Sequence, residues 1–479
     1  MKRRSLLIGP AALAAAPQLQ AQPQPSLART AAESAANVVP SNPEFVPFDL
    51  RRYGADASGA TPSDLAMTNA LMVCGPSGGT IRAPGGHYKF ARPINLDRRR
   101  SIIIAGDAAG TSGSQSATRF TYTGAGNGAF ISMNSAVGCQ VRGLQMAHED
   151  PQYTGTYIQC GNSDPNHPAF MCAVLDCVLG ASPGPGTTHL DLDKTIEFTA
   201  ERCNFIFGNP SVRGRSAGGF SNVIRFRDCQ WSVSHATPVQ NGGQSWIFDG
   251  CAFEPLLSGA AGALYSGNSA SAFNGLVVLG CWLGDASTGG TWIDIYGNGV
   301  MVGGNYISGN NHGPTGVALR QCVGIQIAGN LFDNLLVGVD FAAGPCRDIV
   351  VQSNVANQVA TGFRNGENVL TGSLVWGPNY GFGGPGNNHQ RIAATGYAAD
   401  AAAGVVRQWG AEPIPGAKLS HLVSFPLKFP TECLNVVATL SGGGNAGTAY
   451  VSSFTPHSFE VTMVGGGDGG TLYWQALGN

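Results

Sequence analysis

The sequence repeats one short pattern as Val174-Leu-Asp-Cys177, Ala200-Glu-Arg-Cys203, Phe226-Arg-Asp-Cys229, Phe248-Asp-Gly-Cys251 and Val278-Leu-Gly-Cys281. The pattern continues with Asn in the last position, as Val302-Gly-Gly-Asn305, Ile327-Ala-Gly-Asn330 and Val351-Gln-Ser-Asn354, and Val141-Arg-Gly-Leu144 is an earlier version. Neighbouring versions from Cys177 onward are 22 to 30 residues apart. A catalytic motif does not recur eight times in one chain, whereas the coil of a solenoid does.

The period indicates the kind of solenoid. Helical repeats need about 33–47 residues per unit, and the fixed leucine spacing of leucine-rich repeats is missing. Short β-favouring runs with a period near 24 fit a parallel β-helix, in which equivalent residues stack about 4.8 Å apart from coil to coil. We therefore predict an all-β chain built on such a helix.

The last residue of each pattern is predicted to point inward and to form a ladder along the solenoid axis. Cys behaves as a small apolar residue in a protein interior, and stacked Asn amides bond to one another along an axis. We interpret five of the 12 Cys as packed thiols of this ladder. Neighbouring coils are also close enough for a disulfide, so that alternative stays open.

The composition favours an all-β protein and excludes several classes. The chain has 479 residues, of which 69 are Gly and only 12% are charged. A helical bundle needs more Lys and Glu on its surface, and a disordered chain needs more charge. The formal net charge is −2, which gives no basic field for nucleic acid or an anionic membrane. We expect neither partner, and no membrane-spanning segment.

The N-terminal part of the chain resembles a known family. The residues that carry the resemblance are Phe48-Asp-Leu-Arg-Arg-Tyr53-Gly-Ala-Asp56, Thr61-Pro-Ser-Asp64 before a helix to Cys74, and Gly78-Gly-Thr-Ile-Arg-Ala-Pro84-Gly-Gly-His-Tyr88. They look like the N-terminal cap of the pectate-lyase superfamily, the rhamnogalacturonase/epimerase-like group. The resemblance implies a right-handed parallel β-helix, which we place at residues 44–370, with a capping helix over its open end. Thr61 is predicted to cap that helix, with Asp64 answering it.

The chain begins with features of an export signal. Lys2, Arg3 and Arg4 precede the apolar run Leu6–Ala16, and small residues end near Ala21. We predict a twin-arginine-like signal peptide over residues 1–21 and a disordered leader rich in Pro, Gln, Ala and Ser over residues 22–43. This interpretation places the protein in the periplasm or outside the cell. An incidental basic start is the alternative.

The pattern changes in the C-terminal part of the chain. Residues 371–400 are predicted to be a linker, because Gly, Asn and Pro interrupt the repeat there, and alternating residues over 401–479 predict a small β-sandwich. The sandwich is similar to the C-terminal domain of many phage tail fibres. That resemblance implies a homotrimer and a role in assembly or receptor contact. The segments that carry it are Gln408-Trp-Gly410, Phe425–Thr439 and Tyr473–Asn479.

One group of candidate site residues follows the inward ladder. Glu254 and Asp285 lie in the turns after neighbouring patterns, and Asp333 lies two coils beyond Asp285. Glycoside hydrolysis requires paired carboxylates, so these three are candidate catalytic residues. Trp282 and Tyr306 directly follow a ladder residue and are predicted to point outward as substrate-binding rings. The alternative is that these are ordinary turn residues and covered aromatics.

A second group lies on the strand Trp292-Ile-Asp294-Ile-Tyr296. Alternation predicts that Trp292, Asp294 and Tyr296 point outward, with Arg320 on the same face one coil later. We predict Asp294 as catalytic and Trp292, Tyr296 and Arg320 as substrate-binding. The Trp-Ile-Asp triplet looks like part of a pectate-lyase motif whose Asp helps to bind calcium, but Ile295 replaces the His of that motif. Calcium is therefore expected only for a lyase, and no other cofactor or metal site is predicted.

Two further groups have a structural and a functional interpretation. In the segment His189-Leu-Asp191-Leu-Asp193, the His and both Asp side chains are predicted to point outward. They are interpreted either as part of a lyase site or as residues with a structural role only. Charged side chains of alternating sign are predicted to stack from coil to coil. They are interpreted either as a structural ion-pair ladder or as a site for an anionic sugar. The two stacks are Glu201–Arg227–Asp249 and Asp176–Arg202–Asp228.

These observations lead to an exported enzyme that degrades polysaccharide, as a glycoside hydrolase or a polysaccharide lyase, in a groove along the β-helix. The warrant is an analogy of fold. Two alternatives stay open: a phage-derived tailspike depolymerase, and a noncatalytic, glycan-binding trimeric spike. The catalytic signatures of pectate lyases and polygalacturonases are missing, so no catalytic residue is transferred from either family.

Overall fold

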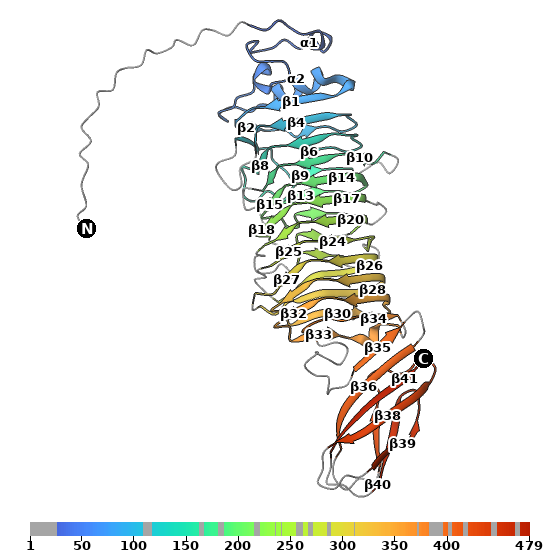
Figure 1. The fold of residues 1–479 in the computed structure, drawn as a ribbon. Helices are drawn as coiled ribbons and strands as arrows, with labels where there is room; N and C mark the ends of the chain where they lie inside the picture. The colour runs from blue at the N-terminus through green and yellow to red at the C-terminus, as the bar shows by residue number, and fades with distance from the viewer. Residues whose placement is uncertain are drawn as a thin grey trace, which may run out of the picture.

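The structure is a computed structural model of the chain (Figure 1). It describes all residues except 1–25, 109–116, 162–166, 181–185, 215–220, 235, 241, 255–261, 267–271, 285–288, 311, 371–372, 383–395, 401–404, 415–419, 442–447 and 465–469. The described residues form a long β-solenoid, with short helices at its N-terminal end and two small sheets after its last coil. The prediction of an all-β chain built on a parallel β-helix is confirmed.

One parallel sheet runs along the whole solenoid, and we call it the 11-stranded sheet. Each of its short strands pairs in parallel with the strands of the coils before and after it. The strands are β2 (Gly86–Phe90), β5 (Thr118–Tyr122), β8 (Gln145–His148), β12 (Val178–Leu179), β15 (Asn204–Ile206), β18 (Gln230–Ser232), β21 (Ala252–Phe253), β25 (Trp282–Leu283), β27 (Tyr306–Ser308), β29 (Leu331–Asp333) and β32 (Val355–Asn357).

The other 23 strands of the solenoid form two parallel rows. The first row comes just before the 11-stranded sheet in each coil and contains β1 (Gly79–Ala83), β4 (Ile102–Gly106), β7 (Gln140–Arg142), β11 (Ala173–Leu175), β14 (Thr195–Glu201), β17 (Asn222–Arg227), β20 (Gln244–Asp249), β24 (Val277–Leu279), β31 (Arg347–Gln352) and β34 (Leu374–Trp376). The second row comes just after it and contains β3 (Ile94–Asn95), β6 (Ala129–Ser132), β9 (Thr156–Gln159), β13 (Thr188–Asp191), β16 (Val212–Arg213), β19 (Val239–Gln240), β22 (Leu264–Tyr265), β30 (Val337–Ala343) and β33 (Thr361–Arg364). The rows are joined by β10 (Ala169–Phe170), β23 (Phe273–Asn274) and the long strands β26 (Thr291–Gly303) and β28 (Thr315–Ala328).

The residue before the last position of each pattern makes a left-handed corner. Its φ is 53° at Asp176, 50° at Arg202 and Asp228, and 61° at Gly250. This backbone conformation is unfavourable for most side chains and easiest for Gly, Asn and Asp, which explains the residue types that recur there. The corner turns the chain from the first row into the 11-stranded sheet.

The ladder that follows the corner changes its chemistry midway. All 12 Cys are free and buried, and ladder thiols donate to carbonyl groups of the coil before, as from Cys203 Sγ to Val174 O (3.3 Å). From Asn305 onward the side chains bond to one another, as from Asn305 Nδ2 to Asn330 Oδ1 (2.9 Å). The predictions of packed thiols and of an Asn ladder are confirmed. The ladder continues one coil further than predicted, to Asn379.

Helix α2 (Asp64–Cys74) packs against the first coil and covers the N-terminal end of the solenoid, as predicted (Figure 1). The predicted capping by Thr61 is wrong: the N-cap residue is Ser63, and Thr61 binds Asp56 through both its backbone N–H (2.7 Å) and its hydroxyl (3.1 Å). The described residues also contain the single-turn helices η1 (Leu50–Tyr53), η2 (Gly75–Ser77) and η4 (Gly366–Asn368). No helix in the described part of the chain is long and apolar enough to cross a membrane.

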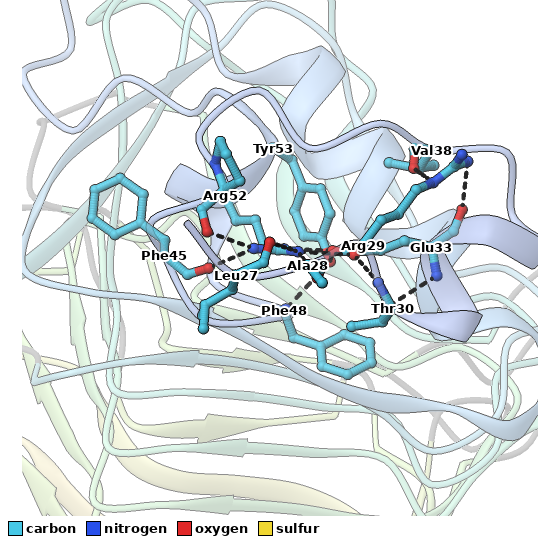
Figure 2. A network of polar contacts seen from close by, with 11 residues as sticks. Leu27, Ala28, Arg29, Thr30, Glu33, Val38, Phe45, Phe48, Arg52 and Tyr53 are labelled. Atoms are coloured by element: carbon cyan, nitrogen blue, oxygen red, sulfur yellow. Dashed lines mark hydrogen bonds and ion pairs between the residues drawn. The ribbon is translucent and has the colours of Figure 1, made fainter. Parts of the chain in front are cut away.

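Residues 26–43 are ordered, so the prediction of a disordered leader is wrong for this part of residues 22–43. Helix α1 (Ala31–Ala35) brings Glu33 against Arg52, and both side chains are fully buried (Figure 2). Arg52 donates from Nε and Nη2 to the two carboxylate oxygens of Glu33 (2.6 and 3.0 Å), and these bonds lower the pKa of Glu33 to about 2. The guanidinium also donates to the backbone carbonyls of Ala28, Pro43 and Phe45.

The solenoid continues beyond residue 370, which we predicted as its end. β34 pairs with β31, and Phe382 packs into the solenoid core. Residues 396–400 already form the first strand of the C-terminal part. The predicted linker over 371–400 therefore begins too early, because the Gly-rich composition conceals one further coil.

The C-terminal part consists of two small antiparallel sheets, as predicted for the sandwich. One sheet contains β35 (Gly396–Asp400), β36 (Val405–Ile414), β41 (Gly470–Gly478) and β38 (Cys433–Ser441). The other contains β37 (Ser420–Ser424), β40 (Ser458–Val464) and β39 (Thr448–Phe454). Phe425, Phe429, Phe459 and Trp474 form their shared core, which is separate from the solenoid core.

Candidate functional site

A strip of large side chains runs down the outward face of the 11-stranded sheet. The strand register places Trp282, Tyr306, Leu331, Val355 and Tyr380 at equivalent positions of five successive coils. We call these five residues the outward strip, and at about 4.8 Å per coil it is about 19 Å long. The two predicted rings are half-buried, and the last three side chains are 39%, 45% and 64% exposed.

The first two rings of the outward strip are held by their neighbours. Trp282 and Tyr306 stack with their centroids 6.5 Å apart and their planes at 11°. The indole of Trp282 lies over Gly284, where an added Cβ would come within 2.5 Å of the ring. The Tyr306 hydroxyl donates to Asp333 Oδ2 (2.8 Å). Both rings are thus oriented before a ligand arrives, which lowers the entropic cost of binding.

Two of the predicted carboxylates flank the strip. Asp333 accepts a second hydrogen bond from Asn357 Nδ2 (2.8 Å), and Glu254 accepts one from Gln230 Nε2 (2.5 Å). An ionised carboxylate offers about four acceptor positions. Each of these side chains therefore has the capacity to accept further hydrogen bonds from hydroxyl groups of a ligand.

The described carboxylates beside the strip do not form a hydrolytic pair with each other. The register puts Glu254 and Asp333 three coils apart, which corresponds to about 14 Å. Glycosidases separate their two carboxyl groups by about 5–9.5 Å. Asp285, the predicted partner of Glu254, lies outside the described residues, so the pair Glu254–Asp285 stays a prediction.

The second predicted group forms a different face, on β26 and β28. Arg320 Nε and Nη2 donate to the two carboxylate oxygens of Asp294 (2.6 and 2.9 Å), and this bonding raises the pKa of Arg320. Tyr296 is half-buried and pairs with Arg320 in the strand register. The outward carboxylate of this face is thus already bound by a cation of the same chain.

The same bonding recurs further along this face. Asp340 lies two coils beyond Asp294 in the register and forms an ion pair with Arg364. In the described part of the chain no three His, Cys, Asp or Glu side chains are placed to hold a metal ion. The calcium expected for a lyase therefore stays a prediction without a described site.

Trp292 does not belong to this face, and the prediction that it points outward is wrong. It is 1% exposed, and its indole N–H donates to Ser308 O (2.9 Å) in the 11-stranded sheet. The register places Ala263 and Gly316 at the equivalent position of the neighbouring coils. Their small size leaves room for the indole inside the solenoid.

His189 occupies the same position in its coil, and its predicted outward orientation is wrong as well. The fully buried ring stacks on Tyr157 (5.6 Å, 4°) and Phe205 (5.8 Å, 25°), and burial lowers its pKa to about 3. Asp191 is also buried and pairs with Arg213 (2.8 Å). The position lies where the chain enters the second row, so two successive residues point inward there and strict alternation fails.

The charge stacks form ion pairs between and within coils. Arg202 donates from Nε and Nη2 to Asp176 (2.6 and 3.0 Å) and also contacts Glu201. Arg227 lies 3.7 Å from Asp249. These pairs support the structural interpretation of the stacks, and each exposed pair contributes little stability.

Sequence reasoning missed four residues of the two faces. Leu331, Val355 and Tyr380 extend the outward strip, and their signal was their place directly after the ladder residues Asn330, Asn354 and Asn379. Tyr265 is 37% exposed and lies one coil before Asp294. Its strand has only two residues, too few to show a period.

The C-terminal part of the chain matches a known family. Residues 400–479 match the family described as tail fiber protein gp53-like, C-terminal. A P. aeruginosa R2 pyocin fiber, which is 25% identical, covers 18% of this chain and 24% of its own, with a TM-score of 0.17. A comparison with curated protein sequences found no match.

The solenoid is similar to solved structures at low sequence identity. ORF18 of Geobacillus virus E2 is 12% identical, covers 87% of this chain and 76% of its own, and gives a TM-score of 0.50. The A-module of the Azotobacter vinelandii mannuronan C-5 epimerase AlgE6 is 14% identical to this chain. The match covers 69% of this chain and 99% of the A-module, with a TM-score of 0.48. The chain is thus a parallel β-helix followed by a small C-terminal part, residues 400–479, that is similar to a tail-fibre C-terminal family.

Proposed function

We propose that the chain is a phage-derived tailspike-type protein that binds a polysaccharide along the outward strip of its solenoid. The observation that carries the proposal is the presence, in one chain, of a long β-helix and a C-terminal domain that matches a tail-fibre family. The resemblance to tail-fibre C-terminal domains implies receptor contact, and a cell-surface polysaccharide is the receptor that we propose. The resemblance of this domain to phage tail-fibre C-terminal domains implies a homotrimer assembled through it, and we include that trimer in the proposal.

The chemistry of the outward strip suits a chain of sugars. The apolar face of a sugar ring packs on an aromatic ring such as Trp282 or Tyr306, and sugar hydroxyls donate to carboxylates such as Asp333. The strip is about 19 Å long, so it spans several sugar units. Pre-oriented rings on successive coils match a polymer better than a single small molecule.

Replacement of one ring on each face tests where the polysaccharide binds. We expect Trp282→Ala to weaken binding of the full chain to the best glycan of a polysaccharide panel tenfold or more. The matched control is Tyr265→Ala, which removes an exposed ring from the other face. Loss of binding in Tyr265→Ala with unchanged binding in Trp282→Ala would move the site to the β26–β28 face.

The same panel decides whether the spike also cuts its ligand. New ultraviolet absorbance identifies a lyase, and new reducing ends without it identify a hydrolase. Binding without either product identifies a noncatalytic spike. If a hydrolase is found, Glu254→Gln, Asp333→Asn and Asp285→Asn should separate the predicted catalytic carboxylates from merely binding ones.

The second candidate function is an exported enzyme that degrades polysaccharide. The run Lys2-Arg-Arg4 before Leu6–Ala16 is the observation in its favour, because it is similar to a twin-arginine signal. The N-terminal sequence of the protein from its native source distinguishes the two. A chain that begins after residue 21 supports export, and an intact Met1 in a phage particle supports the spike.

A further inference from the structure

The solenoid reverses its charge along its axis. Residues 81–227 contain fourteen Lys and Arg against ten Asp and Glu. Residues 228–346 contain a single Arg against seven Asp and Glu, a formal net charge of −6. The first two rings of the outward strip and both flanking carboxylates, Glu254 and Asp333, belong to this acidic part.

The one cation of the acidic part is not available to the strip. Arg320 lies on the β26–β28 face and donates to both carboxylate oxygens of Asp294. The strip itself and the residues beside it in the register are aromatic, aliphatic, acidic or amide side chains, among them Gln230, Glu254, Asp333 and Asn357. Among the described residues, no Lys or Arg occupies a register position of the strip or one directly beside it, so a ligand there meets a negative potential.

The hydrogen-bonding groups have the same bias. Glu254 and Asp333 are acceptors, and an ionised carboxylate has no donor to offer. Sugar hydroxyls supply the donors that these side chains need. A carboxylate, sulfate or phosphate on the glycan would place acceptor against acceptor and negative charge against negative charge, which is the arrangement that binding surfaces use to reject a wrong partner.

We infer that the glycan bound on the outward strip carries no acidic groups: it is a polymer of neutral or amino sugars, not of uronic acids and not phosphorylated or sulfated. This inference rests on the proposed function, because it assumes that the strip binds glycan. It goes beyond that proposal by naming the class of glycan, from the charge of the surface alone.

Matched polymers test the inference on the full chain. The probes are pullulan, mannan and galactan, each paired with the product of oxidising its primary alcohols to carboxylates. We expect at least one neutral polymer to bind, and its oxidised form to bind at least tenfold more weakly. The difference should shrink in 0.5 M salt, because screening over a few ångströms removes the repulsion.

The possible outcomes separate this inference from the proposed function. An oxidised polymer that binds as well as its neutral parent, or better, overturns the inference and leaves glycan binding in place. If neither form of any polymer binds, the proposed function itself is overturned, and the inference with it.

Charge variants assign the selectivity to the strip. We expect the double variant Glu254→Gln with Asp333→Asn to reduce the ratio of the affinity for a neutral polymer to the affinity for its oxidised form at least threefold. The matched control is Asp228→Asn with Asp249→Asn, which removes the same charge from exposed positions on the corner and the first row. If both double variants reduce this affinity ratio equally, the selectivity against acidic polymers does not come from the outward strip.

Discussion

Trp282 and Trp292 lie in consecutive strands of one coil, and the structure uses them in opposite ways. Trp282 lies half-buried on the 11-stranded sheet, stacked on Tyr306 and available to a ligand. Trp292 lies inside the solenoid between the small residues Ala263 and Gly316. The difference shows that the alternation of inward and outward side chains holds within a sheet but fails where the chain turns into the next sheet.

The two faces also differ in what they leave for a ligand. On the outward strip, Asp333 is held by the neutral donors Tyr306 and Asn357 and keeps its charge uncompensated. On the β26–β28 face, Asp294 is bonded at both oxygens by Arg320. Four experiments test this difference between the two faces.

Removal of the buried indole should have the largest effect. We expect Trp292→Ala to lower the free energy of unfolding by about 3–5 kcal/mol, because it leaves a cavity and an unpaired Ser308 carbonyl. Trp282→Ala should lower it by less than about 1 kcal/mol. Denaturant unfolding of both variants measures this, and similar losses in the two would contradict the assignment of one Trp to the core and one to the surface.

Acidification should destabilise the chain through His189. This residue occupies the same position in its coil as Trp292, where the chain enters the second row. The pKa of His189 is lowered to about 3 by burial, whereas an unfolded chain binds the proton below about 6.5. Between these values only the unfolded state is protonated, so stability falls as the pH falls from about 6.5 to 3. We expect the free energy of unfolding to be about 3 kcal/mol lower at pH 4 than at pH 7.

The variant His189→Phe isolates this effect, because Phe fits between Tyr157 and Phe205 and does not titrate. Unfolding curves at pH 7 and pH 4 should show a smaller acid loss for the variant than for the parent chain. Identical losses would mean that other groups, such as Glu33, carry the acid sensitivity.

Breaking the ion pair of the β26–β28 face should have a moderate effect. We expect Arg320→Gln to cost about 1–2 kcal/mol, because Asp294 loses its partner in a partly buried site that solvent still screens. A second change to Asp294→Asn should restore part of the loss. Glycan binding should stay unchanged in both variants if the outward strip is the binding surface.

Removal of one hydroxyl from the strip should have the smallest effect. We expect Tyr306→Phe to cost less than about 1 kcal/mol of stability, since it deletes one half-exposed hydrogen bond to Asp333. Glycan affinity should fall only a few-fold, because the stacked ring remains. A loss of binding as large as that of Trp282→Ala would mean that the hydroxyl, and not the ring, recognises the sugar.

Much of the fold could be predicted because the repeated pattern is local. The period of the pattern and the inward position of its last Cys or Asn can both be read from the short segment that recurs in each coil. The position of Trp282 beside Tyr306 followed directly from this register. Leu331 obeys the same rule, directly after Asn330, whereas Tyr380 lies in the further coil that the Gly-rich composition of residues 371–400 conceals.

The errors share a different cause, which is contact between segments far apart in the sequence. Glu33 is ordered because it meets Arg52 of the solenoid cap, which composition cannot reveal. Thr61 is an exception to this cause, since the Asp56 side chain that it binds lies only five residues before it. The interior position of His189 depends on rings contributed by two other strands, β9 and β15.

The repeat in the sequence is enough to identify a solenoid and the residues that stack from coil to coil up to Asn354, because parallel strands convert a period along the chain into neighbours in space. The sequence also shows the acidic character of residues 228–346. Which of those neighbours are available to a ligand depends on the folded coil as a whole. Trp292 is buried where the chain enters the second row, and Asp294 is bonded to Arg320 of the next coil. Both facts depend on the shape of the whole coil and not on any one strand.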